Sequence, residues 1–115
     1  MEAFFTSQAS IEADRSAAGR RYLEFLRVPD LSAGLYVLEA GAEDAQTPHG
    51  EDEVYVLLHG RCRFRAGGEE QDVGPGSVLF VPARVDHRFL EIRERVEALV
   101  FFGPAEGSLP SQEPD

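Results

Sequence analysis

The 115-residue sequence has no lysine, no asparagine and no tryptophan, and it contains a single cysteine. Without lysine the chain can form no Schiff-base nucleophile and has no phosphate-binding lysine of a P-loop. One cysteine leaves no partner for a disulfide within the chain, which is typical of a reducing compartment. No apolar run approaches the roughly 18 residues of a membrane helix, and no basic segment followed by an apolar stretch marks a signal peptide. We therefore expect a cytoplasmic protein that has no membrane partner.

Positive charge is also scarce, because 11 arginines stand against 21 aspartates and glutamates and the net charge is -10. A protein that binds the nucleic-acid backbone needs a basic stripe, so we expect no nucleic-acid partner. The hydrophobic share of 43% and the length fit one globular domain. We place this domain at residues 1–103, with residues 1–20 partly irregular. Residues 104–115 are rich in proline, serine and acidic residues, and we expect them to form a disordered tail.

Short runs of Val, Leu, Phe and Tyr alternate with Gly, Pro and Asp from residue 21 onward. Such runs are typical of successive strands, and no segment among them carries the 3.6-residue period of a long helix. Residues 10–13 fit either a loop or one helical turn. The pattern predicts an all-β sandwich or barrel. Strands are expected at residues 21–28, 34–39, 53–58, 61–66, 69–73, 77–81, 87–92 and 97–102.

Two of the expected strand segments, 54–58 and 78–81, are apolar at every position. A strand with one face in water would alternate with polar residues, so both segments should be covered on two faces. In a chain of this length the second cover can come from another copy of the chain. We therefore expect a homodimer.

Histidine and glutamate residues at the starts of two strands point to a metal site. His49 lies four residues before Glu53, across a glycine-containing break, and His87 opens another strand. Two imidazoles and one carboxylate form the ligand set of a mononuclear metal site with open positions. Plainer alternatives are a surface histidine for His49 and a water-exposed carboxylate at the strand end for Glu53. His59 cannot join the site, because it lies six residues beyond Glu53, about 20 Å along a strand.

The spacing of these residues resembles the first sequence motif of the cupin superfamily. That motif runs G-x5-H-x-H-x3/4-E-x6-G. Gly41, His49, Glu53 and Gly60 occupy its positions, whereas Thr47 stands in place of the first histidine. In this motif the chain therefore keeps one histidine and the glutamate and lacks the other histidine.

A second stretch resembles the second cupin motif, which runs G-x5-P-x-G-x2-H-x3-N. Gly76, Pro82 and His87 match it, while Arg84 replaces the second glycine and Glu91 replaces the asparagine. The resemblance extends from about residue 35 to residue 102. It implies an all-β jelly-roll barrel, also called a double-stranded β-helix, with metal ligands that project inward near one mouth.

The resemblance also implies that His49, Glu53 and His87 bind one divalent metal ion per chain, which we expect to be Fe, Mn, Zn or Ni. Because Thr47 replaces a histidine, that position is free for water or substrate. Gln46 is the nearest alternative oxygen donor and is a candidate for the fourth ligand. The neighbouring proline makes the inward or outward direction of Gln46 hard to predict.

The surroundings of the expected metal follow from strand parity. Tyr55 lies two residues after Glu53 and shares its face, so Thr47 or Tyr55 is expected to relay a proton or to hydrogen-bond the substrate. Phe89 lies two residues after His87 and should share its inward face. Other aromatic side chains are candidates for an apolar pocket lining, although we prefer ordinary core packing for each: Tyr36, Phe80 and Phe101.

Several polar residues near the motifs are expected to have structural roles. Cys62 should be buried as a small hydrophobic residue. Arg84 either binds an anionic group at the pocket mouth or, as we prefer, pairs with an acidic neighbour on the surface. Glu51 and Asp52 are expected in a solvated acidic turn.

Two chemistries fit a metal held by three side chains in an apolar cup. Fe or Mn would support dioxygenase-type oxidation of a small organic molecule, which we prefer slightly. Zn or Ni would act as a Lewis acid for isomerase, cyclase or lyase chemistry. The competing class is a cupin module that binds a small molecule or a metal without catalysis, because fold membership does not determine a reaction.

Overall fold

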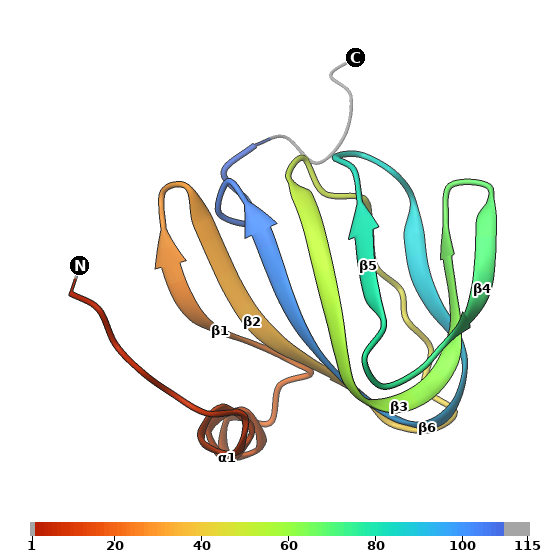
Figure 1. The fold of residues 1–115 in the computed structure, drawn as a ribbon, viewed down its shortest axis with the longest axis horizontal. Coiled ribbons are helices and arrows are strands. Elements are labelled where there is room, and N and C mark those ends of the chain that lie inside the picture. The colour runs from red at the N-terminus through yellow and green to blue at the C-terminus, as the bar shows by residue number, and fades with distance from the viewer. Residues whose placement is uncertain (1, 110–115) are drawn as a thin grey trace.

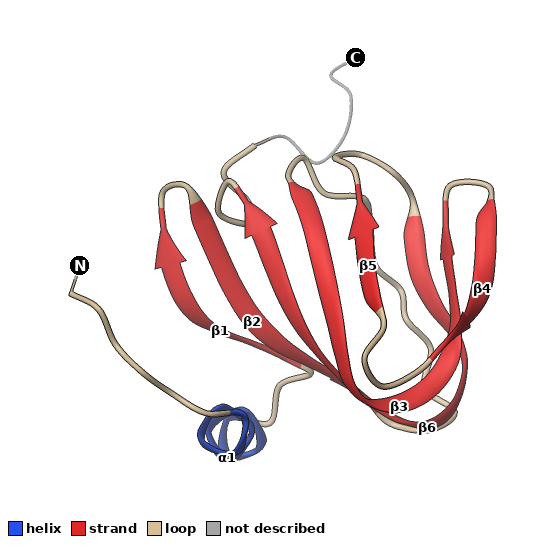
Figure 2. Ribbon diagram, viewed as in Figure 1, coloured by secondary structure: helices blue, strands red, loops and turns tan. Residues whose placement is uncertain are grey.

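The computed structural model describes residues 2–109, which form a curved antiparallel sheet with one helix beside it (Figures 1 and 2). The elements are α1 (Gln8–Ala18), β1 (Tyr22–Val28), β2 (Leu31–Leu38), β3 (Asp52–Ala66), β4 (Glu69–Val73), β5 (Val78–Val81) and β6 (His87–Gly103). The strand order is β1-β2-β6-β3-β4, and β5 pairs with β3. The all-β expectation is confirmed.

The two longest strands, β3 and β6, each replace two of the strands that we predicted. The expected break at residues 59–60 is a bulged region of β3, where the register against β6 shifts repeatedly between Leu57 and Arg63. Gly60 has a φ of +97°, and an added Cβ would lie 2.3 Å from the backbone oxygen of Arg95. Glycine is therefore required at this close approach, and the bulges let both strands bend as the sheet curls.

Helix α1 was not predicted as a full helix, although its end signals are present in the sequence. The Ser7 side chain accepts a hydrogen bond from the amide of Ser10, and Gly19 ends the helix in the left-handed conformation with a φ of 67°. The apolar face of this helix is hard to recognise in the sequence, because Ile11 is the only residue of α1 that is buried. Ile11 packs against Leu35 and Val37 on the outer face of the sheet.

The inner face of the sheet holds the main core, and the residues of β3 before the bulges alternate inward and outward as expected. Glu53, Tyr55 and Leu57 of β3 are all buried, as is Cys62 further along the strand. The outer residue Leu58 packs with the small cluster under α1, so the helix supplies part of the second cover.

On β5 the outer side chains are not covered by any residue in the range 2–109, with Val78 68% and Phe80 60% exposed. The homodimer stays a prediction, and these two residues are the surface that it would need to cover.

The disordered tail stays a prediction: residues 104–109 contact the rest of the chain, and residues 110–115 lie outside the described residues. Ala105 is buried, and the amide of Glu106 donates to Ser32 Oγ at 2.8 Å. The amides of Gly107 and Leu109 donate to the buried carboxylate of Glu51 at 3.2 and 2.8 Å. We call residues 104–109 the C-terminal segment. The single domain over residues 1–103 otherwise stays a prediction.

Within residues 2–109, no helix is both long and apolar enough to cross a membrane.

Candidate metal centre

Three separate elements bring the candidate ligands together. His49 lies in the loop before β3, Glu53 is the second residue of β3, and His87 is the first residue of β6. Their nearest donor atoms all lie within 4.8 Å of one another. His87 and Glu53 are almost fully buried, with side-chain exposures of 1% and 2%, whereas His49 is 22% exposed. The structure therefore assembles the three residues that the motifs indicated.

A backbone hydrogen bond aligns the Arg84 stretch beside this group. The amide of Arg84 donates to the carbonyl oxygen of His49 at 2.6 Å, which joins the two motif regions. Arg84 has a φ of 68°, a left-handed conformation that glycine adopts more easily. Its side chain is exposed and does not line the cavity at the site, which argues against the anion-binding alternative.

The ring of His87 is held in one orientation by the backbone. Its Nδ1 lies 2.9 Å from the carbonyl oxygen of Val85, which can only accept, so Nδ1 carries the proton. Nε2 faces the site and lies 3.1 Å from Oε1 of Glu53. Burial lowers the pKa of His87, but the Glu53 carboxylate and the Val85 carbonyl together outweigh burial and raise it.

The group fits a divalent metal on the chemistry of its donors. Oε1 of Glu53 is buried and receives no well-aligned hydrogen bond from any residue in the described range. A buried carboxylate oxygen of this kind is costly unless a cation approaches it. Two imidazoles and one carboxylate are ligands for Fe(II) or Zn, at bond lengths of about 2.0–2.2 Å. Ligand atoms within 4.8 Å of one another need only small side-chain movements to reach such bonds.

A hydrogen-bonded chain leads from the loop to this group. Asp44 is buried, and its carboxylate accepts a hydrogen bond from the side-chain amide of Gln46 at 2.7 Å. The same carboxylate accepts from the hydroxyl of Tyr36 at 2.6 Å and from the backbone amide of Phe89 at 2.8 Å. These contacts turn the Gln46 oxygen inward, where it accepts from the Tyr55 hydroxyl at 3.0 Å.

The hydroxyl of Tyr55 lies between Gln46 and His87. Its oxygen is 3.2 Å from Nε2 of His87, and its single proton is donated to Gln46. Burial, followed by the charge of Glu53, raises the pKa of Tyr55 well above its ordinary value. Tyr55 therefore remains a neutral phenol whose lone pairs face the site.

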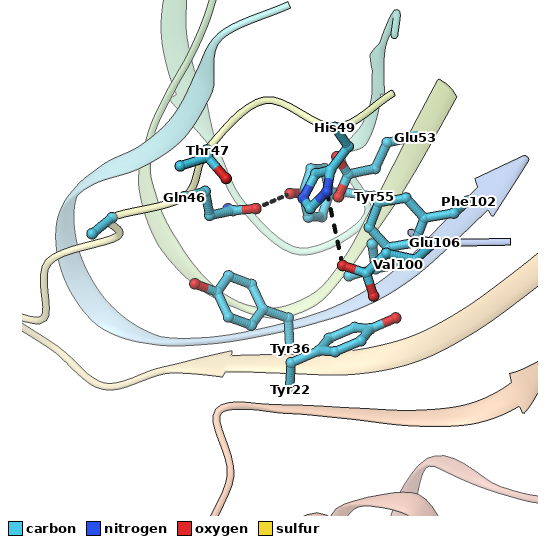
Figure 3. Close-up of a pocket in the computed structure, with 11 residues that line it drawn as sticks. Tyr22, Tyr36, Gln46, Thr47, His49, Glu53, Tyr55, Val100, Phe102 and Glu106 are labelled. Carbon is cyan, nitrogen blue, oxygen red and sulfur yellow. Dashed lines mark hydrogen bonds and ion pairs between the residues drawn. The ribbon is translucent and has the colours of Figure 1, made fainter. Parts of the chain in front are cut away.

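A cavity of about 290 Å³ opens beside these residues (Figure 3). Of the residues we expected at the site, Gln46, Thr47, His49, Glu53 and Tyr55 line it, and so does Tyr36. Their roles as ligands or proton relays stay predictions.

Part of the predicted lining is wrong. Phe80 points outward and is 60% exposed, and it is Phe102 rather than Phe101 that lines the cavity. The bulges between β3 and β6 shift the inward and outward alternation of β6, which explains Phe102. Phe80, in contrast, pairs with Val54, which lies between the inward residues Glu53 and Tyr55. Phe89 is buried against the Tyr55 ring, with the ring centres 5.0 Å apart, and forms the core beneath the site.

Tyr22, Val100 and Glu106 also line the cavity and were not predicted. Glu106 belongs to the C-terminal segment. The amino-acid composition of this segment did not indicate that one of its residues would line the cavity. Oε2 of Glu106 lies 3.8 Å from Nδ1 of His49, which is an electrostatic contact rather than a hydrogen bond. Burial raises the pKa of Glu106, although His49 opposes the shift.

Two further predictions can be compared with the structure. Glu51 is not part of a solvated turn, because it is 2% exposed and its carboxylate holds the C-terminal segment. Asp52 is exposed as expected. His59 is exposed in β3 and lies outside the ligand group.

Comparison with known proteins agrees with the motifs and the fold. The family model described as a cupin domain matches residues 34–102, which is more than half of the chain. The Streptomyces coelicolor protein "Uncharacterized protein SCO3923" is 47% identical over 96 residues, covering 84% of this chain and 91% of that protein.

Solved structures show the same fold. An RmlC-like cupin from Shewanella frigidimarina has a TM-score of 0.67 and 23% identity, covering 73% of this chain and 75% of that one. The DMSP lyase DddQ from Ruegeria pomeroyi has a TM-score of 0.66 and 23% identity, covering 80% of this chain and 50% of that one.

The fold and the site define an all-β jelly-roll protein with a His-Glu-His group beside its cavity. The chain belongs to the cupin family.

Proposed function

We propose that this protein is a mononuclear metal-dependent enzyme that acts on a small organic molecule. The observation that carries the proposal is the convergence of His49, Glu53 and His87, where a buried carboxylate oxygen lacks a well-aligned donor and faces an imidazole nitrogen. The cavity of about 290 Å³ lies near the lower limit for small-molecule sites, which favours a small substrate.

His49, Glu53 and His87 would hold the ion and leave its remaining positions open toward the cavity. The ion would supply Lewis-acid polarisation of a substrate oxygen, or redox chemistry with dioxygen if it is Fe or Mn. The Val85 carbonyl keeps the His87 proton on Nδ1, so that Nε2 stays available. Among the two chemistries we keep the dioxygenase type slightly ahead. The name DMSP lyase for DddQ supports the Lewis-acid alternative by analogy alone.

The remaining residues would position the substrate and its protons. Tyr55 is a neutral phenol that donates to Gln46, so its oxygen can accept a hydrogen bond from a substrate hydroxyl. Because the Gln46 oxygen is engaged by Tyr55, a role for Gln46 as fourth ligand would require this hydrogen bond to break. Thr47 is exposed at the cavity wall and can contact substrate or water.

A test compares turnover with the metal site intact and removed. The purified protein is loaded separately with Fe(II), Mn(II), Zn(II) or Ni(II) and incubated with a metabolite extract, and mass spectrometry follows depletion of small molecules. Oxygen uptake separates the dioxygenase from the Lewis-acid reaction. We expect conversion that is lost in His49→Ala and retained in His59→Ala, which removes an exposed histidine outside the site.

A non-catalytic binding module is the second candidate, and the replacement of a motif histidine by Thr47 favours it, because one family ligand is absent. That candidate predicts saturable binding of a small molecule with no conversion under any of the four metals. Such a result would contradict the enzyme proposal.

A further inference from the structure

One wall of the cavity combines aromatic rings with a carboxylate. Tyr22 meets the ring of Tyr36 edge to face with centres 6.3 Å apart, and it meets Phe102 in the same way at 6.5 Å. Glu106 completes this wall, and in Figure 3 its carboxylate extends into the space between His49 and the two tyrosine rings. We call Tyr22, Tyr36, Phe102 and Glu106 the aromatic wall.

The charges that line the cavity are of one sign. Its described lining includes the carboxylates of Glu53 and Glu106 but no arginine. Arg27 lies nearby, yet its guanidinium donates to the backbone oxygen of Glu106 and pairs with Glu24, at 2.8 and 2.9 Å. No described cationic side chain other than an imidazole therefore neutralises the Glu106 carboxylate from within the cavity.

We propose that the aromatic wall binds the positively charged end of a small organic cation of the ammonium type. The faces of aromatic rings attract such cations, and a carboxylate beside the rings adds an ion pair in a partly desolvated place. The proposal deepens the proposed function and rests on it, because it names the substrate class of the same site.

The arrangement of charge gives the substrate a direction. A divalent ion beside the Glu53 carboxylate and two neutral imidazoles keeps one positive charge, which attracts an oxygen donor. Glu106, whose Oε2 lies 3.8 Å from Nδ1 of His49, places a negative charge on the aromatic wall. A fitting substrate therefore carries an oxygen donor at one end and a cationic group at the other, and a purely anionic molecule is repelled by Glu106.

A glycine of the neighbouring strand β2 makes room for the ring of Tyr22. A Cβ added to Gly34 of β2 would lie 2.3 to 2.4 Å from the end of the Tyr22 ring, so the absence of a side chain there makes room for this ring. The Tyr22 hydroxyl is buried and has no hydrogen-bond partner among the described residues. A ring seated over a glycine with an unused hydroxyl is consistent with a wall that contacts a ligand.

The test uses choline and its uncharged isostere 3,3-dimethylbutan-1-ol as probes. Titration calorimetry measures both on the full chain at neutral pH, first without metal and then with Zn(II). We expect choline to bind about tenfold more tightly than the isostere. Glu106→Gln and Tyr22→Leu should each reduce this preference to about threefold or less, whereas Tyr22→Phe, which keeps the ring, should retain most of it.

Glu69→Gln on β4 is the matched control, because Glu69 is exposed and does not line this cavity. Equal binding of the two probes, tighter binding of the isostere, or binding of neither at millimolar concentration overturns the proposal. Uptake of Zn(II) without a preference for choline would contradict the cation site and leave the proposed function standing. A preference for choline without any metal uptake would support the cation site and contradict the metal-dependent enzyme.

Discussion

The buried carboxylate of Glu51 is predicted to hold the C-terminal segment against the barrel, and Glu51→Ala tests this. Two backbone amides, those of Gly107 and Leu109, donate to its two oxygens. A hydrogen bond to a charged acceptor contributes about 1.5 kcal/mol at the lower end of the usual range, so losing both weakens the attachment by about 3 kcal/mol. This change corresponds to about a hundredfold rise in local opening.

Amide hydrogen exchange followed by NMR measures this opening directly. We expect the amides of Gly107 and Leu109 to exchange about a hundredfold faster in Glu51→Ala, while core amides of β3 change much less. Glu51→Gln keeps one oxygen acceptor and should give an intermediate effect. Glu69→Ala, an exposed site on β4, is the control. A change of less than about threefold in Glu51→Ala would show that this carboxylate does not hold the segment.

Three further predictions concern the sheet, the helix and the outer face. Gly60→Ala should destabilise the fold by about 3 kcal/mol or more in urea unfolding, because its Cβ would meet a backbone oxygen at 2.3 Å and its φ is +97°, whereas Gly68→Ala has open space and should cost less than about 1 kcal/mol. A Gly60→Ala variant as stable as the wild type would contradict the close approach. A hydrogen bond from Arg15 is the main cause that lowers the pKa of Glu12 from 4.5 to about 2, so its stabilisation is complete above about pH 5 and is lost as the pH falls toward 2. Because this side chain is a quarter exposed, Glu12→Gln should cost no more than about 1 kcal/mol at pH 7 and progressively less as the pH falls through about 2, and a cost independent of pH would refute the ion pair. Light scattering should give twice 12.7 kDa for the wild type and 12.7 kDa for Phe80→Glu, and a monomeric wild type would remove the homodimer.

The grouping of the candidate ligands was more predictable than their surroundings, because two of them follow a short-range spacing. His49 lies in the loop before β3, four residues from Glu53 at the start of that strand, so local geometry limits where they lie. His87 was found through the second motif, and the pairing of β3 with β6 brings it close. Glu106 is brought in by contacts of the C-terminal segment with distant residues, and no local pattern encodes such contacts.

The strand errors have one physical origin. A histidine-glycine pair between apolar runs is typical of a turn, but at Gly60 the chain continues as a bulged strand because β6 pairs alongside it. The bulges then reverse which residues face inward, so Phe102 lines the cavity where Phe101 was expected. Helix α1 was missed for a different reason: one buried isoleucine produces almost no 3.6-residue hydrophobic period in the sequence.

Elemental analysis of the freshly purified, untagged protein tests the central claim most directly. The measurement is repeated on His49→Ala and Glu53→Ala, with His59→Ala as the control and circular dichroism as the check on folding. We predict about one divalent ion per chain in the wild type and in His59→Ala, and a loss of most of it in the other two variants. A folded wild-type protein that contains no such metal and takes up none of Fe, Mn, Zn or Ni on titration would contradict the metal centre.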